Sequence, residues 1–274
     1  MGYFEAIVLG TVQGLTEFLP VSSSAHLILA RALLGWDADQ LGMAFDVACH
    51  VGTLLAVVAF FRSDLLAMAA AAPGLFRKPW WPADGPGRQM RLIAFGSVPV
   101  VVAGLLLAGR IEEALRTPLV AATSLLVVAV LFLVVERVGP RTRDEQGLTA
   151  REAVVIGAAQ AMALVPGVSR SGATMTAGMF MGLRRDAAAR FSFLLGVPAI
   201  LGAALHEGLH LLKTGLTAEQ AGIFLVGMTV SAVVGYATVK YFLKYLASHT
   251  LSVFAWYRIA LAAITFGWLV NGRG

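Results

Sequence analysis

The chain has 274 residues, of which 58% are hydrophobic and 14% are charged. A soluble domain carries about 25% charged residues, and the mean hydropathy of this chain is +0.78. These values exclude an ordinary soluble enzyme and a disordered protein, and the single cysteine, Cys49, excludes an internal disulfide. An integral membrane protein remains. Its net charge of +5 indicates basic cytoplasmic loops rather than nucleic-acid binding.

The first apolar region runs over residues 3–34 and is interrupted by the sequence Pro-Val-Ser-Ser-Ser at 20–24. Each half is too short to cross a bilayer, because a crossing takes about 20 helical residues. The proline ends one helix, and the hydroxyl run suits the N-cap of a second one. We therefore expect a helical hairpin that enters the membrane and returns to the same side.

Six further apolar segments are long enough to cross as helices. They are residues 44–61, 92–109, 119–135, 191–212, 222–243 and 253–271. Between the third and the fourth lies a second broken region, 152–183, interrupted by Pro-Gly-Val-Ser-Arg-Ser-Gly at 166–172. Irregular backbone at membrane depth is tolerated only beside protein or a water-filled cavity, so both breaks are candidate functional sites.

The two broken regions resemble each other. The segment 5–10 followed by Gln13 matches the segment 152–157 followed by Gln160, and Pro20 aligns with Pro166 after a one-residue gap. We expect a duplicated chain with repeats 1–145 and 146–274 that form one functional domain. The predicted fold is an all-α integral membrane protein: an inverted-topology repeat with six transmembrane helices and two re-entrant hairpins.

The first break combines a carboxylate, hydroxyl groups and a histidine. Gln13 and Glu17 share one helix face and together offer oxygen ligands to a divalent cation such as Mg²⁺ or Ca²⁺. A carboxylate inside an apolar helix is costly and by default indicates function. The other candidates are Ser22, Ser23, Ser24 and His26. The structural alternative is that the serines cap a helix and His26 makes a buried hydrogen bond.

The second break has the features of a phosphate site. Arg170 lies in an apolar region and offers a bidentate fork to phosphate oxygens. The backbone N–H groups at the start of the following helix bind phosphate as well. The candidate phosphate-binding residues are Ser22, Ser169, Arg170, Ser171, Gly172 and Thr174. The alternative is that Arg170 pairs with Glu17 for structure alone.

Together the two breaks suit phosphoryl transfer, where positioning and charge neutralisation do most of the catalytic work. At these motifs the chain resembles the bacterial undecaprenyl-diphosphatases of the BacA/UppP type, the bacitracin-resistance proteins. The first motif is matched by Gln13, Glu17, Pro20, Ser22, Ser23 and His26; the second by Pro166, Gly167, Ser169, Arg170, Ser171, Gly172 and Thr174. The resemblance covers nearly the whole chain.

The resemblance implies hydrolysis of undecaprenyl diphosphate to undecaprenyl phosphate and inorganic phosphate, usually with a divalent cation. It implies recycling of the lipid carrier for peptidoglycan synthesis, homodimer formation and a location in the bacterial inner membrane with the site open to the periplasmic face. The expected catalytic residues are Glu17, Ser23, His26 and Arg170, with Gln13 and Glu17 at the metal. The nucleophile is Ser23, His26 or a metal-bound water, and Ser23 activated by Glu17 or His26 is favoured.

Three other interpretations stay open. A prenyl-phosphate transporter or flippase shares the inverted-repeat architecture. The sequence His-Glu-Gly-Leu-His at 206–210 matches a zinc-protease signature, although it lies at the end of an apolar segment and has no good third ligand. The PAP2 phosphatases have similar short signatures, but they require a histidine where Thr176 stands.

Basic residues indicate the orientation. Lys and Arg cluster in three connections, with five at 62–91, four at 137–151 and three at 184–190. The positive-inside rule makes these connections cytoplasmic. The connection 36–43 has Asp37 and Asp39 and no basic residue, so it suits the outside. The first hairpin is then expected to enter from outside and the second from the cytoplasm, with both termini outside.

Overall fold

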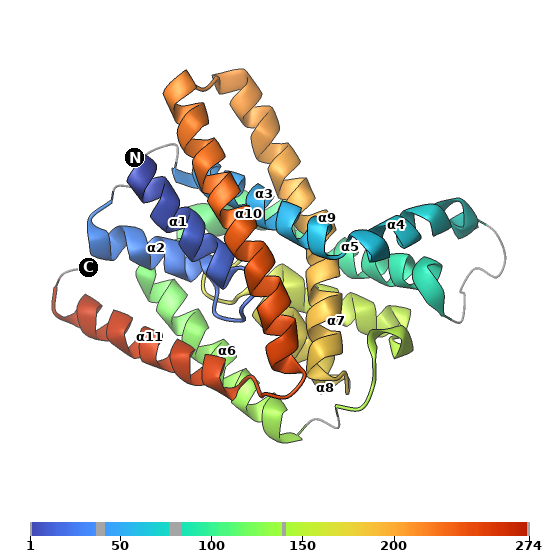
Figure 1. The fold of residues 1–274 in the computed structure, drawn as a ribbon. Helices are drawn as coiled ribbons and strands as arrows, with labels where there is room; N and C mark the ends of the chain where they lie inside the picture. The colour runs from blue at the N-terminus through green and yellow to red at the C-terminus, as the bar shows by residue number, and fades with distance from the viewer. Residues whose placement is uncertain (1, 37–41, 77–83, 139–140, 273–274) are drawn as a thin grey trace.

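The computed structural model describes residues 2–36, 42–76, 84–138 and 141–272 (Figure 1). The α-helices are α1 (Tyr3–Thr16), α2 (Ser23–Leu34), α3 (Gly42–Phe60), α4 (Arg62–Ala71), α5 (Gly85–Leu115), α6 (Pro118–Val138), α7 (Ala150–Met162), α8 (Arg170–Phe180), α9 (Arg185–Thr214), α10 (Ala218–Leu246) and α11 (Ser252–Val270). Short 3-10 helices lie at Ala72–Phe76 and Glu145–Gly147. The described ranges contain helices and no strand, which confirms the all-α class.

The six predicted spans correspond to α3, α5, α6, α9, α10 and α11, all long and apolar enough to cross a membrane. Two of them extend beyond their apolar cores: α5 begins at Gly85 and α9 at Arg185. Much of the described part of the basic connection 62–91 is therefore helical, and it includes α4 as an extra short helix. Large apolar side chains point outward, including Leu105 at 84% exposure. A multi-pass membrane protein is the result.

Each broken region forms two short helices joined by a bend. The helices of the first pair have 14 and 12 residues, which at about 1.5 Å per residue is less than the ~30 Å hydrocarbon core. In the second pair, the chain segment before the first helix lies against the segment after the second helix. The N–H groups of Thr142 and Arg143 donate to the carbonyl of Gly182, and that of Arg184 donates to the carbonyl of Arg143. Entry of either hairpin into a membrane stays a prediction.

Helices of each half pack on helices of the other half. Helix α1 of the first half packs on α10 of the second, and its counterpart α7 of the second half packs on α5 of the first. Helix α6 of the first half lies beside α11, its counterpart in the second (Figure 1). Both hairpin crossings depend on glycine. A Cβ at Gly10 would lie 2.7 Å from the carbonyl oxygen of Gly227, and one at Gly157 would lie 1.9 Å from that of Gly96. This exchanged pairing is what an inverted repeat would produce.

The bends of the two hairpins have the same backbone conformation. Ser22 and Ser169 are the N-caps of α2 and α8, with φ of 73° and 72°. They are 147 residues apart, as are Gln13 and Gln160. The structural register thus continues through the bend without the one-residue gap that the proline alignment needs. Positive φ at a residue other than glycine is strained, and such strain clusters at functional sites.

Candidate active site

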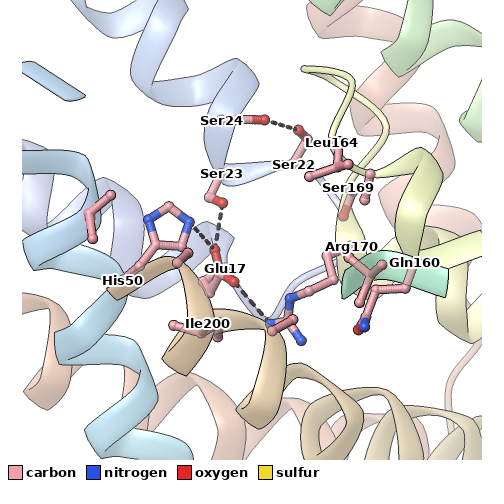
Figure 2. A pocket seen from close by; sticks show the side chains of 15 residues that line it. Glu17, Ser22, Ser23, Ser24, His50, Gln160, Leu164, Ser169, Arg170 and Ile200 are labelled. Carbon is pink, nitrogen blue, oxygen red and sulfur yellow. Dashed lines mark hydrogen bonds and ion pairs between the residues drawn. The ribbon is translucent and has the colours of Figure 1, made fainter. Parts of the chain in front are cut away.

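The two bends meet at a cavity of about 260 Å³ (Figure 2). Its polar wall includes Glu17, Ser23 and Arg170, one part from each hairpin. Helices α3, α5 and α9 contribute apolar residues to the rest of the lining, among them Val100 and Ile200. The cavity therefore combines a charged end with an apolar wall, which suits a molecule that has an anionic head and an apolar chain.

Glu17 is the centre of the polar wall. Its carboxylate is buried and accepts hydrogen bonds from Ser23 Oγ at 2.6 Å, Gln13 Nε2 at 2.9 Å and Arg170 Nη2 at 2.9 Å. His50 Nε2 lies 3.4 Å from the same carboxylate. Figure 2 shows Ser23, His50 and Arg170 converging on it. A carboxylate bonded to a serine hydroxyl is the arrangement that general-base activation requires.

The hairpins are also joined by hydrogen bonds between their bends. Ser171 Oγ of the second bend donates to the carbonyl oxygens of Glu17 and Leu19 in the first, at 3.3 and 3.2 Å. The N–H of Gly167 donates to Ser24 Oγ at 3.5 Å. These contacts fix the position of each bend relative to the other.

Both second helices of the hairpins begin at the cavity. Ser22 Oγ caps α2 and Ser169 Oγ caps α8, the latter through the N–H of Gly172 at 3.1 Å. Ser22 and Ser169 both line the cavity. Two helix N-termini thus converge on one space, and each favours an anion through its N–H groups and its dipole.

Contacts with α9 hold the second bend. Thr174 Oγ1 and Ser192 Oγ share a hydrogen bond of 2.6 Å, and Arg170 Nη1 donates to the carbonyl of Ser192 at 3.3 Å. A Cβ on Gly196 would lie 1.6 Å from Arg170 Nη1. The guanidinium of Arg170 therefore occupies space that is free only because residue 196 has no side chain. Thr174 acts here as a support for Arg170 and does not line the cavity.

His26 lies away from this cluster. Its Nδ1 is 2.7 Å from the carbonyl oxygen of Ser22 and its Nε2 is 2.7 Å from the hydroxyl of Tyr257. Nδ1 therefore carries the hydrogen and Nε2 accepts from the tyrosine, an assignment that follows from the partners. His26 is absent from the cavity lining, which includes His50. The structure joins Glu17 and Ser23 to Arg170, as expected, but not His26.

Residues 6–264 match the family model described as bacitracin resistance protein BacA. The chain belongs to this family. The undecaprenyl-diphosphatase of Rubrobacter xylanophilus is 49% identical over 260 residues, covering 95% of this chain and 96% of the relative. Those of Trichlorobacter lovleyi and Hahella chejuensis are each 46% identical, covering 95% and 98% of this chain and 94% and 99% of the relatives.

A buried arginine of this BacA-family chain was missed at the level of sequence. Arg258 of α11 is fully buried and donates to the carbonyl oxygens of both bends, at 3.0 Å to Pro20 and 2.8 Å to Gly167. Further bonds reach the carbonyls of Ser124, Leu125 and Val168. A charged residue inside an apolar segment is a recognisable signal, and here it indicates a clamp that holds the two bends together.

The predicted cation site consists of Glu17 and Gln13, which contact each other. The described residues include no cluster of three His, Cys, Asp or Glu side chains. Gln13 Oε1, however, is buried and has no hydrogen-bond partner, and it belongs to the side chain that contacts Glu17. Mg²⁺ is commonly held by one or two carboxylates together with substrate phosphates. The donor set of Glu17 and Gln13 fits a cation of that kind when phosphate oxygens complete it.

The zinc-protease signature does not form a comparable site in the described part of the chain. His206 is exposed on α9, and the side chain of His210 lies outside the described residues. Neither Glu207 nor His206 lines the cavity at Glu17. The geometry therefore favours the two bends as the active site of this BacA-family protein.

Proposed function

We propose that this protein hydrolyses undecaprenyl diphosphate to undecaprenyl phosphate and inorganic phosphate. The reaction recycles the lipid carrier for peptidoglycan synthesis and gives resistance to bacitracin, in agreement with the family and its named relatives. The observation that carries the proposal is the contact of Glu17 with both Ser23 and Arg170 at the cavity between the bends. A serine, its base and a phosphate-binding arginine are thereby in one place.

Ser23 is the proposed nucleophile. Glu17 takes the proton of Ser23 Oγ while the oxygen attacks the terminal phosphorus, and the bond from that phosphorus to the bridging oxygen breaks. Undecaprenyl phosphate leaves as a stable anion that needs no proton. A water molecule then attacks the phosphorus of the phosphoserine, and the bond from that phosphorus to Ser23 Oγ breaks. Glu17 gives its proton back to Ser23 Oγ, and inorganic phosphate leaves with the oxygen and hydrogens of the water. Arg170 and the two helix N-termini stabilise the negative charge on the transferring group.

A divalent cation, Mg²⁺ or Ca²⁺, is part of the proposal. Glu17 and Gln13 are the residues that would hold it. When bound, such a cation neutralises charge on the phosphate oxygens. Arg170 orients the terminal phosphate, and Glu17 holds the Ser23 hydroxyl at hydrogen-bonding distance.

Phosphate release in detergent tests the activity against the transporter alternative. The purified protein in micelles is given undecaprenyl diphosphate, and inorganic phosphate is measured. Micelles have no gradient and no second side, so a transporter or flippase would release no phosphate. We expect multiple turnovers with a divalent cation present, and the absence of any release would contradict the proposal.

Ser23→Ala should lower the rate about a hundredfold, because a water held by Glu17 can replace the lost hydroxyl only in part. Ser24→Ala is the matched control. It removes a hydroxyl whose hydrogen bonds go to Ser22 and Gly167 and not to Glu17. Initial rates of phosphate release should fall less than tenfold for that variant. Equal and mild effects of both changes would favour a metal-bound water as the nucleophile.

Gly196→Ala should lower the rate at least tenfold by displacing Arg170, since the added methyl group would overlap its guanidinium. Gly202→Ala is the control on the same helix. A Cβ at Gly202 meets nothing within 4 Å, and alanine favours a helix more than glycine does. Phosphate release and thermal unfolding are measured for both. An active Gly196→Ala enzyme would contradict the assigned position of Arg170.

Cysteine labelling tests the proposed orientation in the inner membrane. In a Cys49→Ala background, Asp39→Cys should react with a membrane-impermeant thiol reagent on spheroplasts, although residue 39 lies outside the described residues. Arg151→Cys should not react, because its connection carries the basic residues expected in the cytoplasm; Arg151 is exposed. The reverse pattern would overturn both the orientation and a site open to the periplasmic face. Homodimer formation stays a prediction of the family resemblance.

A further inference from the structure

Gln160 of α7 carries a buried amide without a partner. Its side chain is 1% exposed, and neither Nε2 nor Oε1 forms a hydrogen bond. It lines the cavity between the bends together with Arg170 and Ser169. A buried amide that makes no hydrogen bond is unfavourable. At the wall of a cavity, such a group indicates a ligand that supplies the missing partner.

The matching residue of the first hairpin does have a partner. Gln13 is 147 residues earlier and donates through Nε2 to Glu17, four positions further on. Four positions after Gln160 the chain has Leu164, which also lines the cavity. The second hairpin therefore has the glutamine but lacks the carboxylate that would accept a hydrogen bond from it. An acceptor must come from elsewhere.

The surroundings of Gln160 select an anion. Arg170 is a cation, and the N-terminus of α8 begins at the same wall. In Figure 2 the Arg170 guanidinium lies between the Glu17 carboxylate and the Gln160 carboxamide. Glu17 and Ser23 are bonded to each other on one side of that arginine. The reacting phosphate belongs on their side, so Gln160 lies where a second phosphate would be.

We propose that Gln160 donates a hydrogen bond from Nε2 to the phosphate that remains on the lipid, and so helps select diphosphates over monophosphates. Arg170 then contacts both phosphates, and the terminal one meets Ser23. This assignment rests on the proposed hydrolysis for the identity of the substrate. Gln160 thus binds the second phosphate and takes no part in proton transfer.

Direct binding of two small probes tests the proposal. Isothermal titration calorimetry on the purified protein in detergent uses methylenediphosphonate, which has two phosphoryl groups and a bridge that cannot be hydrolysed, and inorganic phosphate. Gln160→Ala should weaken methylenediphosphonate binding about tenfold and change phosphate binding less than twofold. Gln160→Glu, which is close in size, should weaken the binding of methylenediphosphonate further, because it replaces a hydrogen-bond donor with a negative charge.

Gln89→Ala is the matched control. Gln89 is also buried, with an unpartnered Nε2, but it does not line the cavity, and both affinities should stay unchanged. With undecaprenyl diphosphate, Gln160→Ala should raise KM about tenfold and change kcat less than threefold. Equal losses for both probes, no loss for either, or tighter cation-dependent binding by Gln160→Glu would overturn the proposal. A wild-type protein that binds both probes without hydrolysing the lipid would instead contradict the proposed function.

Discussion

Arg170→Ala should lower the rate of undecaprenyl diphosphate hydrolysis on the order of a thousandfold. Arg170 is the cation at the cavity wall that contacts Glu17, and α8 begins with it. Removing one preorganised donor from a water-poor site costs about 3–4 kcal/mol of barrier, and each 1.4 kcal/mol is a factor of ten in rate. The loss should appear in kcat, since the charge on the transferring group is greatest in the transition state.

Arg170→Lys is the companion variant for this prediction. Lysine keeps the charge but lacks the planar fork, so it should recover only part of the rate. Thermal unfolding of each purified variant separates loss of activity from loss of fold. An Arg170→Ala enzyme that folds and retains more than about a tenth of wild-type activity would show that Arg170 does not bind the phosphate in the transition state.

Glu17→Gln should abolish most activity, again on the order of a thousandfold, within the range of general acid–base catalysis. The amide presents one acceptor oxygen where the carboxylate accepts from Ser23, Gln13 and Arg170. It also cannot take a proton from Ser23. Initial rates are measured across a titration of Mg²⁺ and Ca²⁺, because Glu17 is the proposed cation ligand and the cation requirement should be lost together with activity.

Gln13→Glu is the companion to Glu17→Gln. The change adds a second carboxylate beside Glu17, which is tolerated when a divalent cation lies between them. Its activity should therefore remain within tenfold of wild type at saturating cation and fall more steeply as the cation is removed. An active Glu17→Gln enzyme with an unchanged cation requirement would contradict the role of Glu17.

The spans and bends could be predicted because their signals are local. Apolar length identifies six helices, and the residues around Pro20 and Pro166 end helices by removing a donor and restricting the backbone. The extra helix α4 and the early start of α5 were missed, since polar residues such as Arg88 and Gln89 continue a helix without adding to an apolar window. Positive φ at Ser22 and Ser169 also carries no signal in residue type.

The site could be predicted in part. Glu17, Ser23 and Arg170 belong to strong local motifs, and hairpins that enter from opposite sides are expected to bring their bends together. The direction of His26 depends on Tyr257 of α11, and the position of His50 depends on how α3 packs, neither of which the spacing along the chain reveals. His50 and Arg258 are polar residues within apolar helices, so the rule that flags Glu17 could have flagged them too.

Activities of Glu17→Gln, Arg170→Ala and the double variant provide the most direct test that the two bends act as one catalytic unit. Phosphate release from radiolabelled undecaprenyl diphosphate is followed at high enzyme concentration, so that residual rates far below wild type stay measurable. Residues that act as a unit have non-additive effects. The double variant should therefore be no slower than the slower single variant, within about threefold. Losses that multiply, so that the double variant falls a further hundredfold or more, would contradict a shared site.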